Sequence, residues 1–339
     1  MTETQFLQDV ISAVDAGASR CRCAVVDASA KVLAVSSGPG AAFSLSAPDA
    51  SIEVIRRCVL EAADRAGVEL PLDGLSLGVA GIGREPERQV FAERMRSLGL
   101  ARRIVATHDA EIALWGAVPS GEGAVVIAGT GAIAVGRSRT GAQARAGGWG
   151  REIDDEGGAW WLGARVLAAV LRAHDGRGPE TALTGAVLQT TGCSHPEQLI
   201  TWLRSSGRSP RDVAELALLA DRAAAAGDEV AIKLLDEAAG ALAEMATACV
   251  RRLGPDSPKE IALLGGLFAS SAYLRRRFCR AVAAALPDVR IVQPRLPPIF
   301  GAVINYWRQS GREVRDELIQ ALEGQISVLP EDWGYERQR

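Results

Sequence analysis

The sequence has few cysteines and none of the spacings that are typical of zinc or iron–sulfur sites. Of the six cysteines in 339 residues, only Cys21 and Cys23 lie close together. Two residues apart on a strand, their side chains would point to one face of a sheet, which favours packing over metal binding. We therefore expect no metal site built from cysteine.

Long apolar runs and basic runs are also missing. No apolar stretch is long enough to span a bilayer, and the first ten residues are polar and acidic instead of basic and then apolar. The net charge is -3, and no basic run is interleaved with aromatic residues, which disfavours a nucleic-acid partner. We therefore expect a cytoplasmic protein that binds neither a membrane nor nucleic acid.

The order of the expected elements contains a weak internal repeat. A hydrophobic content of 48% over 339 residues permits a large core and favours two domains. Three short strands open the chain, three more begin at 124, and helices and further strands follow each set. This order predicts two related α/β lobes. We place them at 1–118, completed by a C-terminal helix within 299–325, and at 119–298 with a helical insertion, followed by a tail at 326–339.

The individual elements follow from hydrophobic periodicity and from the positions of glycine and proline. The expected strands are 10–14, 23–26, 32–35, 74–79, 104–107, 124–127, 133–136, 143–145, 261–264 and 289–292. The expected helices are 50–66, 87–98, one from 110, a broken stretch over 156–252, and others from 272, from 299 and over 314–322. The breaks within the long stretch are expected near 176–179, 192–196, 207–210 and 227.

Residues 15–20, Asp-Ala-Gly-Ala-Ser-Arg, form a turn after the first expected strand. Small residues such as Gly17 let main-chain amides point at phosphate oxygens, and the Ser19 hydroxyl and the Arg20 guanidinium can add charge-assisted hydrogen bonds. Asp15 would hold Mg²⁺ through water, because that ion keeps much of its hydration shell. An ordinary hairpin remains the alternative for this turn taken alone.

A second turn repeats this chemistry at the matching place of the second lobe. It contains Gly129, Thr130 and Gly131. Two such turns at one position of a repeated unit favour phosphate binding, and between two lobes both would face a common cleft. Together the two turns could bind the phosphate chain of one nucleotide.

Asp109 follows the expected strand at 104–107 and precedes a helix. Ligands of open α/β sheets bind at the carboxyl ends of strands, where a carboxylate could accept a proton during phosphoryl transfer. The alternative is that Asp109 is the N-cap of the following helix. We interpret the neighbouring His108 as a packing or hydrogen-bonding residue.

The segment at 147–158, Gly-Gly-Trp-Gly-Arg-Glu-Ile-Asp-Asp-Glu-Gly-Gly, suits a sugar pocket. Its glycines allow close approach of the main chain, Trp149 offers an apolar face to a pyranose ring, and carboxylates accept hydrogen bonds from ring hydroxyls. The alternative is a glycine-rich turn whose acids cap the following helix.

These motifs resemble those of the sugar kinases and ATPases of the actin, hexokinase and Hsp70 fold, and within it the N-acetylglucosamine kinase and BadF/BcrA-type ATPase group. The resemblance runs from about residue 11 to residue 307, and residues 261–270, Ile-Ala-Leu-Leu-Gly-Gly-Leu-Phe-Ala-Ser, match the adenosine motif. It implies two ribonuclease H-like (actin-like ATPase) lobes with a nucleotide and sugar cleft between them. It also implies ATP and Mg²⁺ as cofactors, an amino sugar as substrate, and a homodimer.

The resemblance carries site roles onto matching residues of this chain. Asp109 matches the general base, which also contacts the sugar, and Asp15 matches the residue that positions the metal. The residues implied to bind ATP and its phosphates are Asp15, Gly17, Ser19, Arg20, Gly129, Thr130, Gly131, Gly265 and Gly266. The residues implied to bind the sugar with Asp109 are Gly148, Trp149, Gly150 and Asp155.

Three features depart from the usual pattern of the resembled family. Ala41 stands where many relatives have a sugar-binding Asn, which removes one hydrogen bond worth about 0.5 to 1.5 kcal/mol. Arg151 and Asp154 stand where His and Gly are common. Asp154 could favour the free ammonium of glucosamine, or it could pair with Arg151 or face solvent. No cysteine lies near the second phosphate turn, which disfavours the iron–sulfur activators of the family.

The sequence therefore predicts an ATP-dependent hexosamine kinase that phosphorylates the 6-hydroxyl of N-acetylglucosamine. A glucosamine kinase of the same family is the nearest alternative. An ATPase that acts on a partner protein and a sensor that binds hexosamine without turnover are alternatives from other classes.

Overall fold

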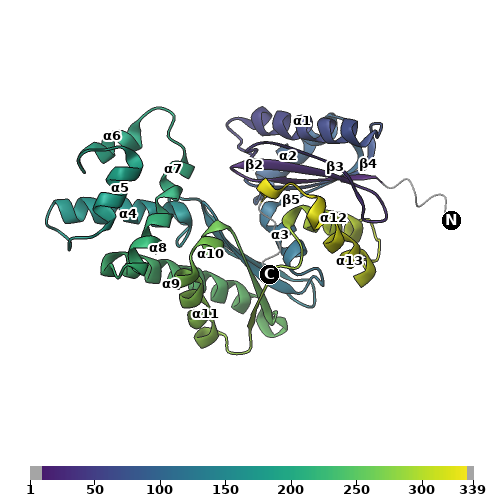
Figure 1. Ribbon diagram of the computed structural model, residues 1–339. Helices are drawn as coiled ribbons and strands as arrows, with labels where there is room; N and C mark the ends of the chain where they lie inside the picture. Colours follow the sequence, from purple (N-terminus) through teal and green to yellow (C-terminus); the bar gives the residue numbers. More distant parts are fainter. Residues whose placement is uncertain (1–9, 334–339) are drawn as a thin grey trace. The chain divides into compact units, whose positions relative to one another are not determined.

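The computed structural model describes residues 10–333, which fall into two compact units. The first unit comprises the chain up to Gly121 together with the part from Pro294 onward, and the second comprises Glu122–Gln293. Figure 1 shows one sheet in each unit, with helices packed on it. Residues 1–9, and the end of the expected tail at 334–339, lie outside the described residues.

The first unit is built on a five-stranded sheet in the order β3-β2-β1-β4-β5. β1, β2 and β3 form an antiparallel meander, and β4 and β5 run parallel to β1. The three expected opening strands are therefore confirmed as a meander. The strand bounds are Ile11–Ala16, Arg20–Val26, Val32–Pro39, Leu72–Val79 and Ala101–His108 for β1 to β5.

Helices cover both faces of this sheet, as Figure 1 shows for α1 and α12. α1 (Pro48–Ala66) packs its apolar stripe on one face, in a core that also takes residues from α2 (Glu85–Ser97). α3 (Asp109–Ala117) and α12 (Pro298–Gln309) cover the other face, followed by α13 (Asp316–Gly324). Glycine at Gly301 permits the close crossing of α12 on α3, because a Cβ atom there would lie 1.8 Å from the carbonyl oxygen of Ile112.

The second unit has a five-stranded sheet in the order β10-β9-β6-β7-β8. β6, β7 and β8 are an antiparallel meander, and β9 and β10 run parallel to β6, which repeats the strand arrangement of the first unit. The internal repeat expected from the sequence is therefore confirmed at the level of topology. The bounds are Gly123–Ala128, Ala132–Arg137, Gln143–Gly147, Glu260–Leu264 and Arg290–Val292 for β6 to β10.

Helices of the second unit occupy the stretch expected to be helical, and the four breaks expected at glycine and proline are confirmed, whereas a further break at Leu216 was not expected. α9 is the longest and packs on the sheet beside α11. α4 begins at residue 159 instead of 156, because Gly157 has a positive φ of 81° and Gly158 is the N-cap. The bounds are Ala159–His174, Leu183–Thr191, Gln198–Arg204, Pro210–Glu215, Ala217–Ala225, Glu229–Arg252, Gly266–Ser270 and Ala272–Ala285 for α4 to α11.

The neighbouring cysteines are packing residues, as expected. Cys21 and Cys23 are fully buried in the core beneath α1. A hydrogen bond with Cys58 together with burial raises the pKa of Cys21, and burial raises the pKa of Cys23 to about 12, so both remain neutral thiols at physiological pH. Within residues 10–333 no cluster of three or more His, Cys, Asp or Glu could hold a metal, and no helix is long and apolar enough to cross a membrane.

Candidate functional site

The first predicted phosphate turn joins β1 to β2. The N–H of Gly17 donates to the carbonyl of Arg20 at 2.9 Å, which closes the turn, and the carbonyl of Gly17 accepts from the N–H of Ala41 at 3.0 Å. A Cβ atom on Gly40 would lie 1.9 Å from the carbonyl oxygen of Ala18, so glycine is required where the chain after β3 crosses the turn. Ala41, which replaces the usual Asn, therefore lies directly beside this turn.

Charged side chains stand on both sides of this turn. Asp15, near the end of β1, is buried and lies 3.0 Å from the guanidinium of Arg22. Arg20 is half exposed and pairs with Asp332 at 3.2 Å. The sequence interpretation missed Arg22, although β-hairpin pairing places it directly opposite Asp15.

Asp109 lies at the same edge of the sheet as the first turn. The parallel register places Ala16 beside Val79 and Val79 beside His108, so β1, β4 and β5 end in one row. Neighbouring strands are about 4.8 Å apart, which puts the ends of β1 and β5 roughly 10 Å from each other. The parallel strands thus bring the predicted base and the predicted phosphate turn to one edge, as expected for a ligand site.

The alternative role of Asp109 as the N-cap of α3 is wrong. The N-cap is His108, whose Nδ1 accepts a hydrogen bond from the N–H of Ala110 at 3.2 Å. Asp109 is the first helical residue, and its Oδ1 accepts from the same N–H at 2.9 Å. The carboxylate is 31% exposed, so a ligand can reach it. The hydrogen-bonding role expected for His108 is confirmed.

The second predicted phosphate turn joins β6 to β7, and α4 is anchored on it. The carbonyls of Gly129 and Thr130 accept from the N–H groups of Ala159 and Trp160 at 2.8 and 2.9 Å. These donors are backbone amides of the first turn of α4, which have no partner within the helix. The carbonyls of the phosphate turn therefore satisfy them in place of a capping side chain. Among the described residues, apart from the chain neighbours of Gly129, no heavy atom lies within 4 Å of the position that a Cβ atom on Gly129 would take.

Asp155 joins the predicted sugar loop to this turn. Burial raises the pKa of Asp155, although hydrogen bonds from the backbone amides of Gly150 and Ala132 oppose the shift. Its backbone is left-handed, with φ of 57°. A Cβ atom on Gly131 would lie 2.4 Å from its carboxylate, so glycine is needed at that position of the turn. One carboxylate therefore contacts both predicted ligand-binding segments of the second unit.

Trp149 is presented to solvent by contacts within its own loop. The indole is 56% exposed, and the guanidinium of Arg145 lies 4.8 Å from its ring centroid. Arg145 donates to the carbonyls of Gly147, at 3.0 Å, and Gly148. An exposed, oriented indole can stack on a sugar ring. Sequence reasoning missed Arg145, for which the only signal is its position four residues before the tryptophan.

The acids of this loop do not cap α4. The N-cap is Gly158, which has no side chain, and the first turn of α4 contains no acid. Asp154 accepts instead from the N–H of Trp149 at 3.0 Å. The expected alternative of an ion pair between Asp154 and Arg151 is also wrong, because Arg151 pairs with Glu152 at 2.9 Å. Asp154 therefore closes the loop that carries the indole.

The predicted adenosine motif lies beside the second turn. β9 ends at Leu264, which pairs with Ile127 at the end of β6. Gly265 follows with φ of 100°, and a Cβ atom on it would lie 2.3 Å from the carbonyl oxygen of Ala128. Gly266 then begins α10. The two glycine segments of the second unit are thus in contact at one edge of its sheet.

This arrangement agrees with a family whose model matches residues 13–304, described as the BadF/BadG/BcrA/BcrD ATPase family. The chain belongs to that ATPase family. The family expected from the sequence motifs is therefore confirmed.

Relatives of this ATPase family cover most of the chain. An N-acetylmuramic acid/N-acetylglucosamine kinase of Clostridium acetobutylicum is 32% identical over 86% of this chain and 96% of its own length. An N-acetyl-D-glucosamine kinase of Dictyostelium discoideum is 28% identical over 88% and 97%. The crystal structure of a candidate N-acetylglucosamine kinase from Chromobacterium violaceum matches with a TM-score of 0.72 and 27% identity, covering 87% of this chain and 98% of that one. The expected α/β fold with two actin-like lobes is confirmed.

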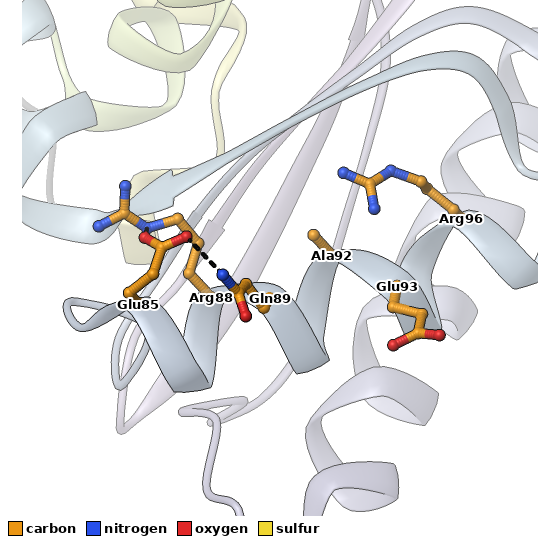
Figure 2. A pocket seen from close by; sticks show the side chains of 6 residues that line it. All are labelled: Glu85, Arg88, Gln89, Ala92, Glu93 and Arg96. Atoms are coloured by element: carbon orange, nitrogen blue, oxygen red, sulfur yellow. Dashed lines mark hydrogen bonds and ion pairs between the residues drawn. The ribbon is translucent and has the colours of Figure 1, made fainter.

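The structure also has two surface hollows. Figure 2 shows the first, about 420 Å³, whose lining is one charged face of α2 with a hydrogen bond between Gln89 and Glu85 at 3.1 Å. The second, about 760 Å³, lies along α9 and includes Glu156, which precedes α4, and Trp161 in the first turn of α4. Neither contains a predicted site residue, and a solvated helix face explains the first.

Proposed function

We propose that this ATPase-family protein is an ATP-dependent hexosamine kinase that transfers the γ-phosphate to the 6-hydroxyl of N-acetylglucosamine. The observation that carries the proposal is the placement of Asp109 at the end of β5, in one row with the end of β1 and its turn. A carboxylate and a phosphate turn at one sheet edge are what transfer to a hydroxyl requires. The kinase names of the two relatives support the same class of reaction.

Asp109 would take the proton of the attacking hydroxyl. The amides and hydroxyls of the two turns, from Gly17, Ser19, Gly129, Thr130 and Gly131, would hold the phosphates, with Arg20 as a cation. Gly265 and Gly266 would lie against the adenosine. Phosphoryl transfer gains mainly from positioning and electrostatics, so the backbone contacts that fix these turns matter as much as the base.

The surroundings of Asp15 suit a residue that would bind hydrated Mg²⁺. It is a single buried carboxylate beside the first turn, and the described residues contain no cluster that could hold a metal without a nucleotide. Mg²⁺ typically keeps several waters and binds one or two carboxylates plus substrate phosphates. When bound, the ion would neutralise charge on the phosphates.

The sugar would stack on Trp149 and approach the main chain of Gly148 and Gly150, with Asp155 as a hydrogen-bond acceptor. Glucosamine is a less favoured substrate because the Asp154 carboxylate is engaged with the N–H of Trp149. A cytoplasmic location and a homodimer belong to the same proposal.

The test is release of ADP from Mg·ATP with no sugar, N-acetylglucosamine, glucosamine, N-acetylmuramic acid or glucose. Strong stimulation by N-acetylglucosamine, with a product phosphorylated at the 6-hydroxyl, is expected. Hydrolysis that is independent of sugar would instead support an ATPase acting on a partner. Sugar binding without any ADP release would support a sensor.

A further inference from the structure

The C-terminal segment Glu331–Trp333 (η4) lies against the two arginines of β2 that follow the first turn. Trp333 is only 3% exposed and belongs to the core formed with α12 and α13. Its carbonyl accepts from Nη2 of Arg22 at 3.2 Å, and the guanidinium of Arg22 lies 6.0 Å from the centroid of the indole. Asp332 contacts Arg20 through both its carbonyl and its carboxylate.

Arg22 carries this contact on to Asp15. The two residues are directly opposite in the β1–β2 pairing, and Nη1 of Arg22 donates to Oδ2 of Asp15 at 3.0 Å. Their side chains are only 20% and 11% exposed, so solvent screens the pair little. Because the guanidinium is planar, one orientation of Arg22 sets both hydrogen bonds: Nη1 faces the carboxylate of Asp15, and Nη2 faces the carbonyl of Trp333.

A second arginine of the same unit makes similar contacts away from the turn. Arg312 donates through Nη2 to the carbonyl of Ala28 at 2.6 Å, and its guanidinium lies 4.4 Å from the centroid of Trp307. Both arginines therefore join an indole to a backbone carbonyl. Arg22 differs because it also holds the carboxylate at the start of the predicted phosphate turn.

We propose that Arg22 and Trp333 are positioning residues of the nucleotide site. Trp333 holds Arg22, and Arg22 sets the direction of the Asp15 carboxylate toward the hydrated Mg²⁺ that accompanies the nucleotide. The inference rests on the proposed function for the role of Asp15. In this proposal η4, more than 300 residues after the first phosphate turn, belongs to the same nucleotide site as that turn.

Calorimetric binding of ADP with and without Mg²⁺ tests the proposal, and this measurement needs no sugar. Arg22→Gln should weaken binding of MgADP about tenfold, as the loss of one charge-assisted contact implies, and binding of ADP alone by less than about twofold. Arg22→Lys should lie between, because it keeps the charge but loses the fork. The matched control Arg312→Gln should lower the melting temperature and leave both affinities unchanged.

The possible results separate the two proposals. If the wild-type protein binds no MgADP, the proposed function and this inference both fail. If it binds MgADP and Arg22→Gln binds equally well, the ion pair is structural and only this inference fails. If Arg22→Gln does not fold, Arg22→Lys decides in the same way.

A double-mutant cycle tests whether Trp333 acts through Arg22. Trp333→Ala should weaken MgADP binding in the same direction as Arg22→Gln, and the double variant should match Arg22→Gln alone. Additive effects would show that Trp333 does not act through the arginine. Trp333→Phe replaces Trp333→Ala if the smaller side chain unfolds the protein at the assay temperature.

Discussion

Nδ1 of His108 lies 3.0 Å from Oδ1 of Asp109, and both atoms accept from the backbone N–H of Ala110. The shared N–H holds one oxygen of the Asp109 carboxylate at the start of α3. The predicted base is thus oriented by the helix that it begins.

Asp109→Asn should lower turnover about 10²- to 10⁴-fold while nucleotide affinity stays near the wild-type value, because the amide keeps the shape but cannot accept the hydroxyl proton. Its oxygen can still accept from the N–H of Ala110. The measurement is kcat by ADP release together with calorimetric binding of MgADP. Glu111→Gln, in the same helical turn, is the matched control, and near-normal turnover of Asp109→Asn would remove Asp109 from the mechanism.

Asp154→Asn should raise KM for N-acetylglucosamine and for glucosamine by the same factor, about three- to tenfold. The reason is that the variant weakens a charge-assisted hydrogen bond to the N–H of Trp149, which orients the indole for either sugar. Steady-state kinetics with both sugars measure the ratio. A loss confined to glucosamine would show instead that the carboxylate binds the ammonium group.

Asp155 should make the second unit less stable as the pH rises. Burial raises its pKa above the unfolded value, so its contribution to stability is present below the unfolded pKa and is lost as the pH rises through the folded pKa. We expect wild type to lose stability relative to Asp155→Asn as the pH rises above about 4, the usual pKa of an Asp carboxyl group. Urea unfolding at several pH values measures the difference, and a constant difference would contradict the prediction.

Asp228 should show the opposite dependence on pH. Burial opposes ionisation, but hydrogen bonds from the amides of Ala231 and Ala182 and from the hydroxyl of Thr181 lower its pKa overall. Its stabilisation is therefore present above the unfolded pKa and is lost as the pH falls through the folded pKa. As the N-cap of α9, it should cost about 1 to 2 kcal/mol when replaced by Ala.

The same unfolding measurements check Asp228→Ala, because Asp155 and Asp228 lie in one unit. At neutral pH the variant should be less stable than wild type, and the difference should shrink in acid. Equal stability at neutral pH would mean that water or another group replaces the cap.

Local signals in the sequence were sufficient for most of the fold. Alternating apolar residues predicted the meanders, and the expected breaks in the long helical region coincide with glycine or proline, such as Gly227 before α9. The break at Leu216 between α7 and α8 has neither residue nearby and was not predicted. The short helix α10 was not predicted, because five residues after Gly265 are too few to show a helical period. The helix expected from residue 156 begins three residues later, because the backbone at Gly157 is left-handed and Gly158 is the N-cap.

The contacts of the candidate site were less predictable, because they depend on residues that are distant in sequence. Asp154 offers no local sign that it accepts from Trp149 instead of pairing with Arg151. Trp333 lies 311 positions from the arginine it contacts. A sequence motif shows which residue types form a turn, whereas the side chains that contact the turn come from distant parts of the sequence and are known only from the fold.

The crossing of α12 on α3 has a consequence for synthesis of the chain. One face of the β1 sheet is covered by a helix that begins only at Pro298, after the whole of Glu122–Gln293 has been made. During translation the second unit can therefore complete its own core while the first unit still exposes an apolar surface. The order of folding on the ribosome should be the reverse of the order in which the two units begin.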